Sequence, residues 1–364
     1  DPTRPGLLYL GTENAIYVSF DDGDGWMPLQ GDLPHAPVYW FEVQPHFNDL
    51  VVATYGRGFW ILDDITPIQQ LRDEVLATPV HLFQPRPAYR FASREGRSAQ
   101  PGDPAAGRNP TQGASINFRL GEGATGPVIV RIETERGQVV RELPVRNAQQ
   151  GLNRVYWNLR HEASAPPRLR TPAMEHGHVT VGENGWRSAP DGGSVRPIAV
   201  PGRYRVRLIA GSEERTAMLE VLQDPETEAT AAEMQAQLDL QLELREMSDS
   251  TSALINRIEW TRKGIMDLDE RLGGNGAYAD VLTAASELEE ALVELEMRLF
   301  DLRLSGGASR QDTIRWPRQL WAKIASLASY SSGSDDAPTD QMLEVRDGYR
   351  QQLAEVLARW VELA

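Results

Sequence analysis

The sequence has no cysteine, and lysine occurs in it only at Lys263 and Lys323. Without cysteine the chain cannot form disulfides, use a thiol nucleophile or bind a metal through sulfur. It also lacks any run approaching about 18 consecutive apolar residues, so we expect no membrane-spanning helix. The net charge of -15 argues against nucleic acid as a partner, because a protein that binds nucleic acid needs a positive surface.

The negative charge is concentrated in the last part of the chain. Residues 224–364 carry 27 acidic and 14 basic side chains, a net charge of -13. This change in composition predicts a domain boundary at Asp224-Pro225. We expect the acidic side chains to form a solvated helical surface.

The first seventy residues contain an internal repeat. Residues 8–12 (LYLGT) match residues 50–54 (LVVAT) at an offset of 42, and on the same offset Tyr17-Val18 falls on Phe59-Trp60. A period of about 40–45 residues with short β-rich runs is typical of the blades of a β-propeller. We therefore predict that residues 1–70 form the last one or two blades of such a fold.

The first copy contains the sequence SFDDGDGW at residues 19–26. It resembles the Asp-box, S-x-D-x-G-x-x-W, of bacterial sialidase-like and sortilin-like (VPS10, BNR) propellers, many of which are labelled "glycosyl hydrolase". The matching positions are Ser19, Asp21, Gly23 and Trp26. The resemblance implies that Asp21 holds a tight turn and is not catalytic, and that Trp26 packs between neighbouring blades. It also implies a location outside the cytoplasm, either periplasmic or secreted.

By analogy with the second copy, the first residues lie where the inner strand of a blade ends. One and a half blades cannot close a ring, and an open sheet leaves unpaired strand edges. We therefore expect the remaining N-terminal blades to come from the same gene product or from a separate chain, as a partner of this segment.

The middle of the chain contains a proline- and arginine-rich stretch, residues 71–113, which we interpret as a linker. Alternating strand patterns resume over residues 114–223. The runs at 128–132, 137–141, 151–157 and 201–204 resemble immunoglobulin-like domains of the flagellar-hook-cap type. That resemblance implies a β-sandwich in which Trp157 fills the core and Tyr204 opens the final hairpin.

An insertion at residues 161–200 interrupts this pattern, and we expect it to be a long loop that covers the sandwich. It contains His176 and His178, which could both reach one ion. A zinc site would need a third ligand, for which Glu175 is the near candidate. We expect no metal here and no cofactor elsewhere.

Residues 224–364 have the apolar spacing of long helices. Leucines at 288, 292, 295 and 299 recur at steps of 4, 3 and 4, which gives one apolar stripe that needs a partner helix. Breaks rich in glycine and serine predict four helices, at 226–272, 277–303, 313–331 and 338–364, with Pro317 in a first turn. Residues 224–364 contain no histidine and therefore no Glu-x-x-His pair, which argues against a di-iron site in these helices. The expected fold is multidomain β plus α: terminal propeller blades, an immunoglobulin-like sandwich and a C-terminal helical bundle.

The chain offers no recognisable catalytic set. Its 6 histidines lie in no nucleophile elbow or zinc motif, and Asp63 and Asp64, if adjacent on a strand, would point to opposite faces. A binding site is easier to argue, because aromatic side chains with polar neighbours suit sugars or peptides. The candidates, all expected on one face of the propeller, are Glu13, Asn14, Tyr39, Trp40, Tyr55 and Arg57. An alternative role for Trp40 is to plug the ring.

Three functions remain open. The leading hypothesis is a non-enzymatic extracytoplasmic binding or scaffold protein whose propeller recognises a protein or glycan. The second is a glycoside hydrolase whose catalytic carboxylates lie in upstream blades. The third is an assembly subunit that joins a larger complex through the acidic helical segment.

Overall fold

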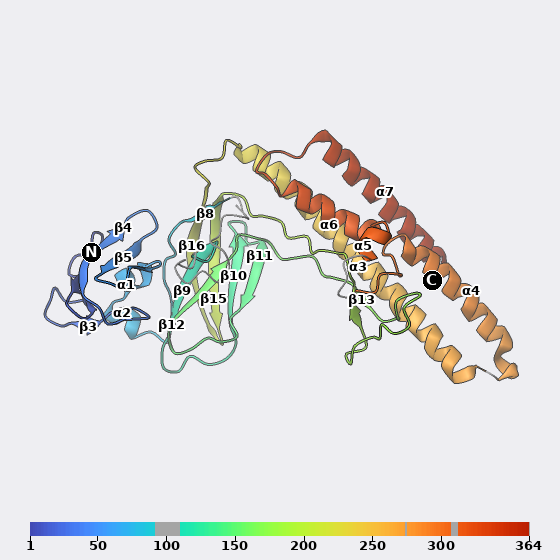
Figure 1. Cartoon of the computed structure of the whole chain (residues 1–364), viewed down its shortest axis with the longest axis horizontal. Helices are drawn as coiled ribbons and strands as arrows, with labels where there is room; N and C mark the ends of the chain where they lie inside the picture. The colour runs from blue at the N-terminus through green and yellow to red at the C-terminus, as the bar shows by residue number, and fades with distance from the viewer. Residues whose placement is uncertain (92–109, 274, 307–311, 364) are drawn as a thin grey trace. The chain divides into compact units, whose positions relative to one another are not determined.

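The computed structural model describes residues 1–91, 110–273, 275–306 and 312–363 (Figure 1). The chain combines several β-sheets with α-helices, as expected. It divides into two compact units, one formed by Asp1–Leu159 and Pro201–Glu226 and the other by Arg160–Val200 and Thr227–Ala364. Across the described residues, no helix combines the length and the apolar character needed to cross a membrane.

The N-terminal repeat folds as two antiparallel sheets of three strands each, in the orders β1-β2-β3 and β4-β5-β6. Their strands are β1 (Leu8–Gly11), β2 (Ile16–Ser19), β3 (Met27–Pro28), β4 (Val38–Gln44), β5 (Asp49–Thr54) and β6 (Phe59–Leu62).

The two copies of the repeat correspond strand for strand, but not on a single offset. Leu8 pairs with Ser19 in the first sheet, and Leu50 pairs with Leu62 in the second. The turn that follows β5 is one residue longer than the turn that follows β1. Phe59 therefore corresponds to Ile16, and the alignment of Tyr17 with Phe59 was wrong by one residue. This shift decides which side chains share a face, because neighbouring residues of a strand point to opposite sides.

A small apolar core joins the two sheets. Ile16 from the first sheet is buried together with Val38, Leu50 and Val52 from the second. The ring of Tyr9 meets the ring of Phe41 edge-on at 6.3 Å between centroids, and burial raises the pKa of Tyr9 to about 12. After β6 the chain turns into a short helix, α1 (Thr66–Gln70), with a proline in its first turn.

The rest of the first unit contains a five-stranded sheet, β11-β10-β15-β16-β8, and a three-stranded sheet, β12-β9-β7. Their strands are β7 (Val80–Leu82), β8 (Ala88–Arg90), β9 (Ala114–Leu120), β10 (Val128–Thr134), β11 (Val139–Pro144), β12 (Gly151–Trp157), β15 (Gly202–Ala210) and β16 (Glu213–Gln223). The strands predicted from alternation are confirmed. Trp157 is fully buried, with its ring edge-on to Tyr204 at 5.0 Å.

The interpretation of residues 71–113 as a linker was wrong for their first part. After the short helix α2 (Asp73–Leu76), strand β7 pairs with β9, and β8 adds to the edge of β16 in parallel. Buried Val80, Leu82 and Phe83 explain this, because their apolar surface outweighs the loop-like composition around them. Residues 92–109, the middle of the expected linker, lie outside the described residues.

The insertion, which we expected to be a loop of the sandwich, belongs to the helical unit instead. Its two short strands, β13 (Arg168–Leu169) and β14 (Arg187–Ser188), pair with each other. Leu169 and Val195 enter the same apolar core as the helices. The backbone amides of Ala165 and Arg168 donate to the side chains of Asp249 and Asn256.

The helical elements are α3 (Ala231–Leu272), the 3₁₀ turn η1 (Gly276–Tyr278), α4 (Ala279–Met297), α5 (Asp312–Arg315), α6 (Leu320–Ser331) and α7 (Asp340–Leu363). Thr230 and Glu233 form a capping box that starts α3. The apolar stripes meet in one core that includes Leu244 and Ile258 of α3, Leu295 of α4, Ile324 of α6 and Leu353 of α7.

Two helix boundaries differ from the prediction. Helix α4 ends at Met297, and the chain then makes a turn in which Leu299, Phe300 and Leu302 are buried. The expected third helix is interrupted around Pro317, and α6 begins at Leu320. Proline lacks an N–H group and disfavours the helical conformation of the residue before it, so it ends the short α5 instead of starting α6. Two of the predicted breaks reach into residues 274 and 307–311, which lie outside the described residues.

Candidate functional site

Two exposed tyrosines lie at one end of the N-terminal sheets. Tyr39 and Tyr55 expose 62% and 69% of their surface, and their ring centroids lie 5.7 Å apart. The N–H of Tyr55 donates to the carbonyl of Pro37 at 2.9 Å, which fixes the turn after β5 beside the start of β4. The pair is therefore a preformed aromatic surface open to solvent.

The turn that carries Glu13 and Asn14 lies next to this surface. The carbonyl of Thr12 accepts a hydrogen bond from the N–H of Val38 at 2.8 Å. The Thr12 hydroxyl accepts from the N–H of Ala15 at 3.1 Å, which shapes the turn and leaves Glu13 and Asn14 exposed. Arg57 is also exposed, on the turn after Tyr55, and its carbonyl accepts from the Trp60 indole at 3.0 Å.

Trp40 belongs to a different surface. In the register of the second sheet, Trp40 lies opposite Ala53, which lies opposite Phe59, so the three side chains share one face. Ile61 lies on the same face through its pairing with Val51. Trp40, Phe59 and Ile61 expose 71%, 80% and 59% of their surface. We call this set, with Val51 and Ala53, the outer face of β4–β6.

The equivalent face of the first sheet is covered. Tyr9, Ile16 and Val18 correspond to Val51, Phe59 and Ile61, and Ile16 and Val18 are almost completely buried. Ile16 and Tyr9 pack against the second sheet. Corresponding side chains of the two copies are therefore buried in the first sheet and exposed in the second. Sequence analysis missed Phe59 and Ile61, because the register that places them on this face appears only in the strand pairing.

The turn at residues 19–26 is held by side-chain hydrogen bonds. Asp21 Oδ1 accepts from the Ser19 hydroxyl at 2.7 Å and from the N–H of Gly25 at 2.8 Å, and Ser19 Oγ accepts from the N–H of Gly23 at 2.9 Å. The hydrogen bond from Ser19, followed by that from Gly25, lowers the pKa of Asp21. Gly23 has a φ of 101°, which favours glycine. Trp26 exposes 40% of its surface.

The rings of His176 and His178 meet edge-on, with 5.7 Å between centroids. Glu175, the third ligand that we considered, is exposed. Over the part of the chain that the structure describes, no group of three or more His, Cys, Asp or Glu side chains is placed to hold a metal ion.

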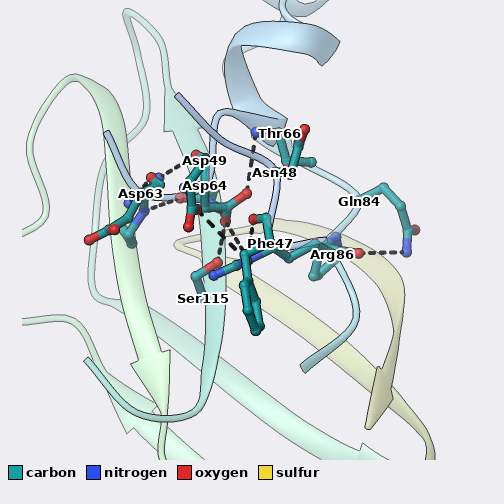
Figure 2. Close-up of polar contacts among 12 residues, drawn as sticks. Phe47, Asn48, Asp49, Asp63, Asp64, Thr66, Gln84, Arg86 and Ser115 are labelled. Carbon is teal, nitrogen blue, oxygen red and sulfur yellow. Dashed lines mark hydrogen bonds and ion pairs between the residues drawn. The ribbon is translucent and has the colours of Figure 1, made fainter. Parts of the chain in front are cut away.

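A buried polar junction, which the sequence did not reveal, joins the N-terminal sheets to β9 (Figure 2). Its centre is Asp64, a buried residue with a φ of 54°. One carboxylate oxygen, Oδ2, accepts from the Ser115 hydroxyl and from Asn117 Nδ2 at 2.9 Å, and the other accepts from the N–H of Thr66 at 3.2 Å. Asp63 and Asp64 follow β6 in a turn, so the expectation that they lie on a strand was wrong.

Arginines complete the junction. Arg154 donates to the carbonyls of Asp63 and Asp64, each at 2.8 Å, and its Nε donates to Asn117 Oδ1 at 2.6 Å. Arg86 lies 3.9 Å from both Asp49 and Asp64 (Figure 2). Burial raises the pKa of Asp49, against the opposing effect of the Asp64 N–H and Arg86. Because both carboxylate oxygens of Asp64 have partners, this side chain serves to position the sheets.

An open cavity of about 730 Å³ lies at one end of the larger sheets. Residues 120–129, 144–146 and 148–150 line it together with Ala210, and Glu122 and Arg146 are its charged residues.

No protein-family model matches the chain, and searches of curated proteins and of solved structures also gave no match.

Proposed function

We propose that the protein binds a glycan or a peptide through the exposed end of its N-terminal sheets, without catalysing a reaction on it. The observation that carries this proposal is the pair Tyr39–Tyr55, with rings 5.7 Å apart and open to solvent. Aromatic rings provide apolar surface for the C–H faces of a sugar or for a peptide side chain. Glu13, Asn14 and Arg57, on neighbouring turns, would supply hydrogen bonds and charge.

The two N-terminal sheets would be blades of a larger β-propeller. This is supported by the outer face of β4–β6, where Phe59 and Ile61 are exposed at the positions that Ile16 and Val18 bury in the first sheet. An exposed apolar sheet face is typical of an interaction surface. The way in which the first sheet is covered indicates that another sheet of the same repeat would cover the second.

The remaining segments would support and position this binding module. Trp157 buried against Tyr204 supports an immunoglobulin-like sandwich in residues 114–223, and the shared core of α3, α4, α6 and α7 supports a helical bundle. Location outside the cytoplasm, periplasmic or secreted, rests on the resemblance of residues 19–26 to an Asp-box.

Binding can be tested with panels of glycans and peptides. We expect the double variant Tyr39→Ala/Tyr55→Ala to lose about tenfold or more in affinity for a ligand found in this way, because exposed aromatic residues of this kind commonly dominate binding energy. Tyr330→Ala is the matched control, since Tyr330 is an equally exposed tyrosine in the helical unit. Unchanged affinity in the double variant would refute the site, and turnover of a glycan by the wild-type protein would favour a glycoside hydrolase instead.

The absence of cysteine allows a separate test of the outer face. A cysteine placed by Phe59→Cys in the full-length natural protein should react with a thiol reagent about tenfold or more slowly than one placed by Tyr330→Cys, because a neighbouring sheet would cover it. Equal labelling rates at the two positions would show that the outer face of β4–β6 is free.

A further inference from the structure

The helical unit contains a buried cluster of three carboxylates around one guanidinium. Arg262 Nη1 lies 2.9 Å from Glu296 Oε2 and 3.2 Å from Glu259 Oε1, and Arg262 Nε lies 2.9 Å from Glu289 Oε1. Glu259 and Glu296 are completely buried, whereas the side chain of Glu289 remains 25% exposed. We call these four residues the carboxylate cluster.

Glu259 connects the cluster to segment 160–200. Its Oε2 accepts from the backbone amides of Arg170 and of Thr171, the latter at 2.7 Å, and its Oε1 accepts from the Thr171 hydroxyl at 2.8 Å. Arg187, from the same segment, donates to the carbonyls of Thr171 and of Leu304 at 3.0 and 3.3 Å. The ionised form of Glu259 is therefore the form that holds residues 170–171 on α3.

The two fully buried carboxyl groups of the cluster share one nitrogen, because Glu259 Oε1 and Glu296 Oε2 both lie within hydrogen-bonding distance of Arg262 Nη1. The buried cations are Arg262 and Arg187, and the acids that face them are Glu259, Glu289 and Glu296. Arg170 also acts on Glu259, but it lies nearer the surface, with its guanidinium 4.1 Å from the centroid of the exposed Trp260 ring. With Glu259 and Glu296 both ionised, two negative charges would lie close together in a dehydrated site, which is costly.

Glu296 is the acid that suits the neutral form. Glu259 has donors on both oxygens, and Glu289 reaches water. Glu296 Oε1 is buried and has no donor partner among the described residues. A proton on Glu296 would have the neighbouring Glu259 carboxylate as an acceptor. Burial, and then the charge of Glu259, raise the pKa of Glu296 well above its usual range.

We propose that Glu296 carries a proton in the folded protein and that loss of this proton weakens the attachment of segment 160–200 to α3 and α4. The cluster is then a pH-sensitive latch. Deprotonation would place a second anion against Glu259 and compete for Arg262, so the bonds from Glu259 to residues 170–171 would open more often. This inference does not depend on the proposed binding function, because none of its residues lies in the N-terminal sheets.

The direction of the effect follows from proton linkage. The folded protein holds this proton more tightly than the unfolded chain, so its contribution to stability is complete below the ordinary glutamate pKa of 4.5. That contribution is lost as the pH rises through the raised pKa of the folded state. The equilibrium constant for opening the latch then increases by up to about tenfold per pH unit over that interval.

Hydrogen exchange across the pH range can test the latch in the whole protein. Exchange of amides 165–173 is expressed as protection factors, which remove the intrinsic base catalysis of exchange. These protection factors should fall with rising pH in the wild-type protein. In Glu296→Gln, which is neutral at every pH and has nearly the same shape, the protection should not change with pH. Glu294→Gln is the control and should keep the wild-type dependence, because Glu294 is an exposed residue of the same helix that lies outside the carboxylate cluster. An identical pH dependence in wild type and Glu296→Gln would overturn the proposal.

Carboxyl NMR of the wild-type protein provides a second measurement if the glutamine variant folds poorly. With ¹³C-labelled glutamate, one carboxyl resonance should keep the chemical shift of the protonated form after the exposed glutamates have ionised. If every glutamate titrates near its ordinary pKa, Glu296 does not hold the proton and the latch is refuted.

Discussion

Replacing Asp64 with alanine tests whether the buried junction holds the N-terminal sheets to β9. The substitution removes the acceptor of the Ser115 hydroxyl and of Asn117 Nδ2, and both donors belong to buried residues. A buried donor without a partner costs about 1–3 kcal/mol. Alanine at a φ of 54° adds about 1 kcal/mol, because a short polar side chain tolerates this left-handed conformation better. We therefore expect a loss of about 3–7 kcal/mol from the free energy of unfolding of the first unit.

Two further variants separate the contributions at this position. Asp64→Asn keeps the tolerance for positive φ and one acceptor oxygen, so it should cost only about 1–3 kcal/mol. Asp63→Ala is the neighbouring control, since Asp63 contributes its carbonyl and not its side chain to Arg154. We expect its free energy of unfolding to stay within about 0.5 kcal/mol of the wild-type value.

The measurement is unfolding by denaturant, monitored by hydrogen exchange at individual amides, so that the stability of each unit is obtained separately. Amides of β9 and β12 report the first unit, and amides of α3 report the second. Asp64→Ala should lower the midpoint of the first set and leave the second unchanged. A decrease below about 1 kcal/mol in the free energy of unfolding of the first unit would refute the reasoning. It would mean that the hydrogen bonds from Ser115 and Asn117 to Asp64 contribute little to stability.

Two other predictions concern burial elsewhere in the chain. Burial, with a smaller effect of Arg245, lowers the pKa of His161 to about 4. The free energy of unfolding of the helical unit should therefore decrease by up to about 3 kcal/mol as the pH falls from 6.5 to about 4. His161→Gln should remove this decrease in denaturant unfolding measured across the pH range, and an unchanged decrease in the variant would contradict the assignment. Trp157→Ala should destabilise the first unit by about 3–5 kcal/mol in the same assay, because the ring is fully buried against Tyr204. Trp40 is exposed, so Trp40→Ala should cost under about 1 kcal/mol. Similar losses of stability in the two variants would refute the assigned burial.

Some of the fold was open to prediction because its signals are local. The alternation of apolar and polar residues in 128–132 and 203–208 predicts strands with one buried face, and β10 and β15 have that pattern. The spacing of leucines at 288, 292 and 295 predicts the buried side of α4. In each case the periodicity of a short segment reports the periodicity of the structure that buries it.

Part of the candidate surface could also be anticipated. Tyr39, Tyr55 and the turn with Glu13 and Asn14 were expected at one end of the repeated sheets, and hydrogen bonds at Thr12 and Pro37 bring them together. Trp40 was grouped with them because it follows Tyr39 in sequence. The strand pairing instead places it on the outer face of β4–β6, because Trp40 lies opposite Ala53 and Ala53 lies opposite Phe59.

By itself the sequence determined most of the strands and helices outside residues 71–91, where the acidic segment begins and which turns carry exposed aromatic residues. Only the tertiary structure decided that residues 160–200 join the helices, that Asp64 is the centre of a junction and that Glu296 faces Glu259. Thr171 and Glu259 lie 88 residues apart, and Asp64 and Ser115 lie 51 residues apart. No periodicity spans such distances, because these contacts form only when the packing of whole elements brings distant polar groups into the same dehydrated space.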